Sequence, residues 1–141
     1  MSKAKDKGTT AERDVVRYLQ NWWPAAERRA LSGNKDKGDV AGIPATVIEV
    51  KAAQRQDLAK WRRETWTEME NAGAHVCVLV VKRPYKSVGQ WDAYMPQTLL
   101  PDALSDIDEE GEAESWLRMD LRLAVAMLET ILDREPSFPS F

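Results

Sequence analysis

Apolar residues recur at helical spacing in three parts of the chain, each with one apolar face. The pattern predicts three helices, over residues 9–23, 57–72 and 117–132. The first can begin at Thr9 and ends before Pro24, and Gly73 ends the second. The apolar stripe of the last helix is long enough either to cover a sheet or to join two copies of the chain.

Shorter apolar segments between these helices are typical of strands. Residues 46–51 have a clear strand pattern, and the continuous β-branched run at 75–81 predicts a strand buried on both faces. Three further strands are expected, at residues 25–31, 39–42 and 91–95, the last at an edge of the sheet. The resulting αβββαβ order, followed by a C-terminal helix, predicts an α/β fold with a small mixed β-sheet flanked by helices.

Size and composition fit a single domain over residues 1–141. The chain is 43% hydrophobic and 30% charged, with one Cys, one His and no apolar run longer than residues 76–81. We therefore expect no internal disulfide, zinc finger, membrane span or signal peptide, and a cytoplasmic location. We also expect a flexible basic start at residues 1–8, an acidic loop at 102–114 and a mobile tail at 136–141.

Charge is distributed unevenly along the chain. Residues 1–87 contain 17 Lys and Arg against 11 Asp and Glu, whereas residues 88–141 contain 3 against 12. The basic part suits a polyanionic partner, and the acidic part is expected to face elsewhere.

Candidate chemistry is concentrated at Asp39 and in the strand that contains Glu49 and Lys51. Because side chains alternate along a strand, Glu49 and Lys51 share one face while Ile48 and Val50 point into the core. Charged groups on an apolar strand are costly to bury unless they are paired or bind a ligand. If Asp39 lies beside Glu49, the two carboxylates repel each other, and a divalent cation relieves that repulsion.

A ligand set made only of oxygen atoms selects Mg²⁺, for which Mn²⁺ can substitute. With Lys51 nearby, such a cation can promote the attack of water on a phosphodiester and neutralise the charge that develops. The Glu-x-Lys triplet alone is a weak signal, since so short a pattern recurs by chance. Its place inside a hydrophobic strand, with Asp39 after a glycine turn, makes the signal stronger.

Residues 7–15, 28–33, 38–40 and 49–51 together resemble the PD-(D/E)xK nuclease superfamily, and within it the archaeal-type Holliday junction resolvases. The resemblance implies a restriction-endonuclease-like core and Mg²⁺-dependent cleavage of DNA by a homodimer. Gly38 stands where the family motif usually has Pro, which leaves the following carboxylate in place. The acidic segment and the many Trp residues are not features of the archaeal enzymes and indicate a divergent viral or bacterial branch, which if viral would act in the host cytoplasm.

The resemblance also assigns roles to individual residues. Glu12, Asp39 and Glu49 would be ligands of the metal or of water, Lys51 the catalytic lysine, and Ser32 part of a catalytic loop. Contacts with branched or duplex DNA are expected from nearby side chains, namely Arg28, Arg29, Lys35, Lys37, Gln54, Lys60, Arg62 and Arg63. No small-molecule cofactor and no membrane partner is expected.

Each of these residues also has a purely structural interpretation. Glu12 can be the last residue of a capping box that begins at Thr9, Asp39 a turn residue and Lys51 a solvated strand end. The cations at residues 60–63 can form a solvated helix face. The combination of all these residues in one short stretch favours a nuclease site.

Three functions remain open at this stage. The first is an endonuclease that resolves four-way junctions, for which a twofold dimer would supply two symmetric cuts. The second is a flap, repair or restriction-like nuclease of the same fold. The third is a non-cleaving nucleic-acid-binding subunit, against which the presence of Asp39, Glu49 and Lys51 argues.

Overall fold

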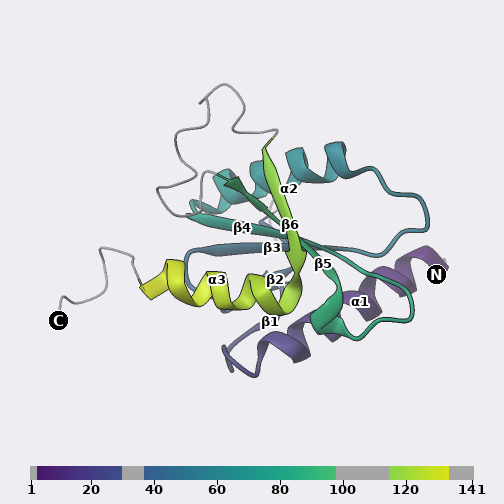
Figure 1. Cartoon of the computed structure of the whole chain (residues 1–141), viewed down its shortest axis with the longest axis horizontal. Helices are drawn as coiled ribbons and strands as arrows, with labels where there is room; N and C mark the ends of the chain where they lie inside the picture. Colours follow the sequence, from purple (N-terminus) through teal and green to yellow (C-terminus); the bar gives the residue numbers. More distant parts are fainter. Residues whose placement is uncertain (1–2, 30–36, 98–114, 134–141) are drawn as a thin grey trace.

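The fold is given by a computed structural model that describes residues 3–29, 37–97 and 115–133. Its elements are α1 (Lys3–Leu19), β1 (Glu27–Arg28), β2 (Val40–Ala41), β3 (Thr46–Lys51), α2 (Leu58–Ala72), β4 (Val76–Val81), the 3-10 turn η1 (Val88–Gln90), β5 (Asp92–Pro96), β6 (Trp116–Asp120) and α3 (Leu121–Asp133). Figure 1 shows one mixed sheet with helices on both faces. The expected α/β class is confirmed.

The sheet has six strands in the order β1-β2-β3-β4-β5-β6. Within the described residues, β3 and β4 are the only parallel neighbours, with Thr46 opposite Val76 and Lys51 opposite Val81. Helix α2 provides the crossover that a parallel pair requires, and the other pairs are antiparallel. The carboxyl ends of two central strands therefore lie side by side at one end of the sheet.

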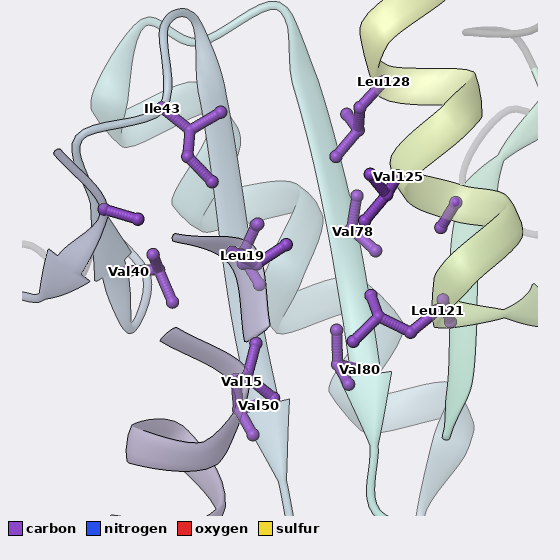
Figure 2. Packing of buried hydrophobic residues seen from close by; sticks show 14 of the residues in the cluster. Val15, Leu19, Val40, Ile43, Val50, Val78, Val80, Leu121, Val125 and Leu128 are labelled. Atoms are coloured by element: carbon purple, nitrogen blue, oxygen red, sulfur yellow. The ribbon is translucent and has the colours of Figure 1, made fainter. Parts of the chain in front are cut away.

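Alternation along the central strands divides the core into two layers. Helices α1 and α3 cover one face of the sheet and α2 covers the other (Figure 1). Together with Ile48, the larger cluster contains residues that Figure 2 shows, namely Val15, Leu19, Val50, Val78, Val80, Leu121, Val125 and Leu128. On the α2 side, Val47, Cys77 and Leu79 pack against Trp61 and Met69. Strand β4 is thus buried on both faces, as its sequence predicts.

The stripe of α3 covers the sheet, which is one of its two predicted uses. Leu121, Ala124 and Leu128 are completely buried against the large cluster, whereas Leu123 on the opposite face is exposed. A second copy of the chain could not use the same stripe without displacing α3. No helix in the described parts of the chain is both long and apolar enough to cross a membrane.

Helix α1 differs from its predicted extent at both ends. It begins at Lys3 rather than at Thr9, so residues 3–8, which were assigned to a flexible start, are helical. The Lys and Ala residues of this segment favour helix and no Pro interrupts them. Thr9 therefore lies inside the helix and cannot begin a capping box, which requires a non-helical first residue. The helix ends at Leu19 instead of residue 23.

The C-terminal part of the fold corrects two further predictions. Residues 116–120 form strand β6 instead of the first turn of the last helix, and β5 is therefore not an edge strand. Leu117 and Leu121 are four residues apart, which suits a helix, but the backbone of Leu117 pairs with Met95 of β5. Of the described part of the predicted strand at 25–31, only β1 is strand. The predicted acidic loop and tail lie outside the described residues.

Gly42, directly after β2, lies in close contact with the backbone of Ala25, shortly before β1. Gly42 has φ 90°, and an added Cβ would collide with the carbonyl oxygen of Ala25. We expect Gly42→Ala to lower the free energy of unfolding by about 2 kcal/mol or more, because it combines strain with a backbone clash. Urea denaturation followed by circular dichroism measures this change.

The matched control is Gly8→Ala in α1, where no atom lies within 4 Å of an added Cβ. That variant should be equal to the wild type or more stable by about 0.5–1 kcal/mol, because Ala favours helix. Equal denaturation midpoints for Gly42→Ala and the wild type would contradict the packing described here.

Candidate active site

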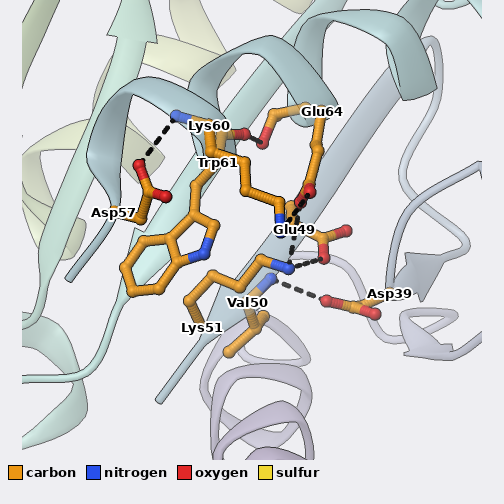
Figure 3. Close-up of polar contacts among 9 residues, drawn as sticks. Asp39, Glu49, Val50, Lys51, Asp57, Lys60, Trp61 and Glu64 are labelled. Carbon is orange, nitrogen blue, oxygen red and sulfur yellow. Dashed lines mark hydrogen bonds and ion pairs between the residues drawn. The ribbon is translucent and has the colours of Figure 1, made fainter. Parts of the chain in front are cut away.

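Backbone pairing between β2 and β3 places Asp39 beside Glu49. Val40 is paired with Ile48, so the preceding Asp39 lies at the level of Glu49. The Asp39 N–H donates to the Ile48 carbonyl oxygen at 2.8 Å, and Asp39 Oδ2 accepts from the Val50 N–H at 2.7 Å. The Asp39 carboxylate is therefore held by the strand that carries its partner, as Figure 3 shows.

Glu49 and Lys51 point from β3 toward α2, on the face opposite Ile48 and Val50. This confirms the predicted alternation. Lys51 Nζ lies 3.2 Å from Glu49 Oε1 and 3.4 Å from Oε2 of Glu64 on α2 (Figure 3). Glu49 is only 5% exposed, and its Oε2 has no hydrogen-bond partner among the described residues. A buried carboxylate oxygen without a partner is the kind of atom that a bound cation would satisfy.

Burial changes the acidity of both carboxyl groups. It raises the pKa of Asp39 to about 8, with a further rise from the nearby charge of Glu49. It also raises the pKa of Glu49 to about 9, and Glu68 on α2 adds to this effect. Burial lowers the pKa of Lys51, but its ion pairs outweigh burial and the net pKa is raised. Without a counter-charge, the two carboxyl groups therefore hold protons at neutral pH while Lys51 stays charged.

These groups open into a hollow of about 630 Å³, here called the acidic cleft. Its lining consists of Lys7, Gly8, Glu12, Asp39, Glu49, Val50, Lys51, Ala52, Ala53, Gln54 and Trp61. Glu12, from α1, is near enough for its charge to raise the pKa of Asp39, after the larger effects of burial and of Glu49. However, its Oε2 accepts hydrogen bonds from Arg28 Nε at 3.1 Å and Nη2 at 2.9 Å. Glu12 thus belongs to the cleft but is paired with Arg28.

The predicted DNA contacts are not all near the acidic cleft. Gln54 lines it, while Lys60 and Arg63 line an adjoining hollow of about 430 Å³, the α2 hollow, together with Glu49 and Lys51. Arg62 lines neither, and its charge acts on Tyr94 on the α2-covered face of the sheet.

Three of the remaining predicted residues, Arg28, Arg29 and Lys37, come from β1 and the segments next to it. Arg28 is paired with Glu12, and the Arg29 N–H donates to the Asp39 carbonyl oxygen at 2.8 Å. Arg29 Nε is buried and has no hydrogen-bond partner among the described residues. Lys37 is exposed two residues before Asp39. Ser32 and Lys35 lie outside the described residues, so their predicted roles stay predictions.

Sequence reasoning missed three members of the site. Lys7 lines the acidic cleft from α1, and Glu64 and Glu68 approach Lys51 and Glu49 from α2. Glu68 could have been found, because it lies seven residues after Trp61 on the apolar stripe of its helix and is 4% exposed. A carboxylate in an apolar stripe is the same signal that identified Glu49.

The donor set fits a hard divalent cation, although the structure does not form a complete cage. In the described residues, no three His, Cys, Asp or Glu side chains are grouped closely enough to hold a metal ion. Two carboxylates facing an open cleft suit Mg²⁺, which keeps several waters and seldom uses a cage made entirely of protein ligands. The orphaned Glu49 Oε2 and the repulsion between Asp39 and Glu49 are consistent with this cation.

No protein-family model, curated protein or solved structure matches this chain. The geometry of the acidic cleft and the short segments that resemble a nuclease superfamily are therefore the features that point to a function.

Proposed function

We propose that this chain is a Mg²⁺-dependent DNA endonuclease with a restriction-endonuclease-like core, and that as a homodimer it resolves four-way junctions. One observation carries the proposal. Asp39 and Glu49 face each other on adjoining strands at an open cleft, and Lys51 lies 3.2 Å from Glu49 on the same face of β3. Two carboxylates can hold a divalent cation, and a lysine beside them can stabilise the negative charge that develops when a phosphodiester is hydrolysed.

Each residue of the cleft has a separate task in this proposal. Asp39 and Glu49 would hold the cation, which supplies the charge that activates water and neutralises the scissile phosphate. Lys51 would donate to a phosphate oxygen and stabilise the negative charge that develops on it. The short bond from the Val50 N–H keeps Asp39 in position before substrate binds.

Basic and polar groups around the cleft support a nucleic-acid substrate. Lys7 and Gln54 lie on one side of it, and Lys60 and Arg63 lie on the other along the α2 hollow. Glu64 and Glu68 also line the α2 hollow, and Lys60 Nζ lies 3.8 Å from Glu64 Oε1. In this proposal Lys7 and Arg63 would therefore supply most of the attraction for a backbone that passes through the cleft. The four-way junction is proposed as the preferred substrate because of the resemblance to junction resolvases. A homodimer would also present a twofold pair of clefts, which suits two symmetric cuts.

The test is cleavage of a labelled four-way junction beside a linear duplex, a flap and a single strand of equal length, each with and without Mg²⁺. The proposal expects paired symmetric nicks in the junction, and sedimentation at micromolar concentration should show a dimer. Preference for the flap or equal cutting of duplex would support the repair or restriction-like alternative. Absence of cleavage in all four, with binding retained, would support the non-cleaving subunit.

We expect the identity of the cation to separate binding from cleavage. Mn²⁺ should support both, Ca²⁺ should support binding alone, and excess EDTA should abolish cleavage. The reason is that Ca²⁺ accepts looser and higher coordination than the octahedral geometry of Mg²⁺. Initial rates of nicking and fluorescence anisotropy of the same labelled DNA measure the two properties. Undiminished cleavage in EDTA would remove the metal from the mechanism.

A further inference from the structure

The loop that follows β4 begins beside the candidate catalytic lysine. Because β3 and β4 are parallel, their carboxyl ends are neighbours, and the Lys82 N–H donates to the Lys51 carbonyl oxygen at 2.9 Å. The next residues are Arg83, Pro84, Tyr85 and Lys86. This segment, here called the 82–86 loop, thus carries three cations and one aromatic ring, and the proposed mechanism uses none of them.

Tyr85 is unusual in two respects, the exposure of its side chain and the conformation of its backbone. Its side chain is fully exposed. Its backbone has φ 65°, in the left-handed region that residues other than Gly and Asn seldom adopt. The Lys86 N–H donates to the Arg83 carbonyl oxygen at 3.3 Å, which closes a turn with Pro84 and Tyr85 at its centre. Pro at the second position and a positive φ at the third are characteristic of a type II turn, in which the third residue is usually Gly. An aromatic ring in that place indicates a use outside the fold.

The loop is also held firmly by a buried side chain. Trp91, which is 2% exposed, donates from Nε1 to the Lys86 carbonyl oxygen at 3.0 Å. Lys82 Nζ lies 5.7 Å from the centre of the same ring, within the range of a cation–π contact. Both ends of the loop are therefore fixed on one core residue, so the backbone that carries Tyr85 has little freedom left to lose on binding.

A third hollow, distinct from the α2 hollow, connects this loop with the acidic cleft. It has a volume of about 390 Å³ and is called the loop cleft here. The loop cleft is lined by Lys7, Ala52, Ala53, Gln54, Lys82, Pro84 and Tyr85. The first four of these residues also line the acidic cleft. A polymer that enters one hollow can therefore continue into the other, past Lys7 and toward Tyr85.

We propose that the 82–86 loop binds an unpaired nucleotide of the DNA strand that leaves the acidic cleft, with its base stacked on the Tyr85 ring. A base inside a duplex has neighbours on both faces, so only a base next to a branch point or a free end offers a face to the ring. The phosphate of that nucleotide lies in the loop cleft, where Lys7 and Lys82 neutralise its charge. This inference rests on the proposed function only in taking DNA as the ligand.

The experiment compares the wild type with Tyr85→Gly and Tyr85→Phe in buffer without divalent cations. Gly removes the ring and suits the positive φ, so this variant should be as stable as the wild type or more stable. The probes are a forked DNA with two unpaired arms and a fully paired hairpin duplex of equal length whose strands are joined at both ends by non-nucleotide linkers, both followed by fluorescence anisotropy. A 2-aminopurine in the first unpaired position of the fork reports stacking directly.

We expect Tyr85→Gly to bind the fork about 5- to 100-fold more weakly while its affinity for the closed hairpin duplex stays within about twofold. Tyr85→Phe should bind like the wild type, and the change in 2-aminopurine emission should disappear in the Gly variant only. Equal losses for fork and hairpin, or no loss for either, would overturn the stacking role. As a charge control, Lys7→Ala should weaken both complexes and reduce the salt slope by about one unit, because Lys7 lines both the acidic cleft and the loop cleft.

Failure of this inference can be told from failure of the proposed function. If the wild type cuts DNA but Tyr85→Gly binds the fork normally, the loop has no such role and the nuclease stands. If the wild type cuts none of the substrates but the fork selectively loses affinity in the Gly variant, the loop binds an unpaired base in a protein that is not a nuclease.

Discussion

Asp39→Asn or Glu49→Gln is expected to reduce DNA cleavage by at least about 100-fold while binding stays equal or becomes slightly tighter. Loss of a single electrostatic group in an active site typically costs about 10²–10³-fold in rate. Each substitution removes one negative charge that the cation needs, and where neither a proton nor the cation neutralises that charge, it also repels the DNA backbone. Both amides keep the shape of the residues they replace, so the cleft should keep its structure.

Nicking rates and anisotropy on the same junction measure the two effects. The matched control is Asp57→Asn, an identical change at the residue that caps α2 and accepts a hydrogen bond from the Lys60 N–H at 3.3 Å. Asn caps helices as well as Asp does, and Asp57 does not line the acidic cleft, so this variant should cut at the wild-type rate. A near wild-type rate for Asp39→Asn or Glu49→Gln in Mg²⁺ would show that the cleft is not the active site.

The second large effect is on stability: Glu49→Gln should stabilise the metal-free protein at pH 8. In the folded protein Glu49 holds its proton up to about pH 9, whereas in the unfolded chain it loses the proton near its ordinary pKa of 4.5. Between these values the folded state binds more protons, so the free energy of unfolding falls as pH rises from about 5 through about 9. Gln has no proton to lose, and Lys51 keeps its ion pair with Glu64.

The expected gain at pH 8 is on the order of 1 to 3 kcal/mol, or several degrees in melting temperature, and it should nearly vanish at pH 5. Thermal unfolding from pH 5 to pH 9 in EDTA measures it. Addition of Mg²⁺ at pH 8 should raise the melting temperature of the wild type more than that of Glu49→Gln, because the cation replaces the proton in the wild type alone. A flat pH profile for the wild type would contradict the close approach of buried acids at this site.

Strand β3 was predictable because its alternation of charged and apolar residues fits only one assignment of side chains to the two faces of the sheet. The segment around Glu49 and Lys51 alternates charged and apolar residues within a β-rich run, so the two faces could be assigned from the sequence. The position of Asp39 opposite Glu49 required only that the short strand after Gly38 pair with its neighbour in the chain. The buried strand that contains Cys77 was predictable from a different pattern, a continuous run of apolar and β-branched residues.

What was missed depends on contacts between distant segments. Glu64 comes within reach of Lys51 only because α2 crosses the sheet in one particular orientation, which periodicity does not specify. The pairing of Leu117 with Met95 overrode a helical spacing, since a free strand edge was available in β5. Tyr85 was overlooked because its importance depends on a backbone angle and on full exposure.

The buried thiol of Cys77 can be used to measure how often the interior of the protein opens. It is the single cysteine of the sequence, is 0% exposed, and packs with Val47 and Met69 between the sheet and α2. Burial also raises the pKa of its thiol, so little reactive thiolate exists in the closed molecule. A thiol reagent therefore modifies only those molecules in which Cys77 has become exposed, either by separation of α2 from the sheet or by unfolding of the whole domain. If the labelling rate exceeds the rate expected from global unfolding, the difference measures how often the layer that carries Glu64 opens.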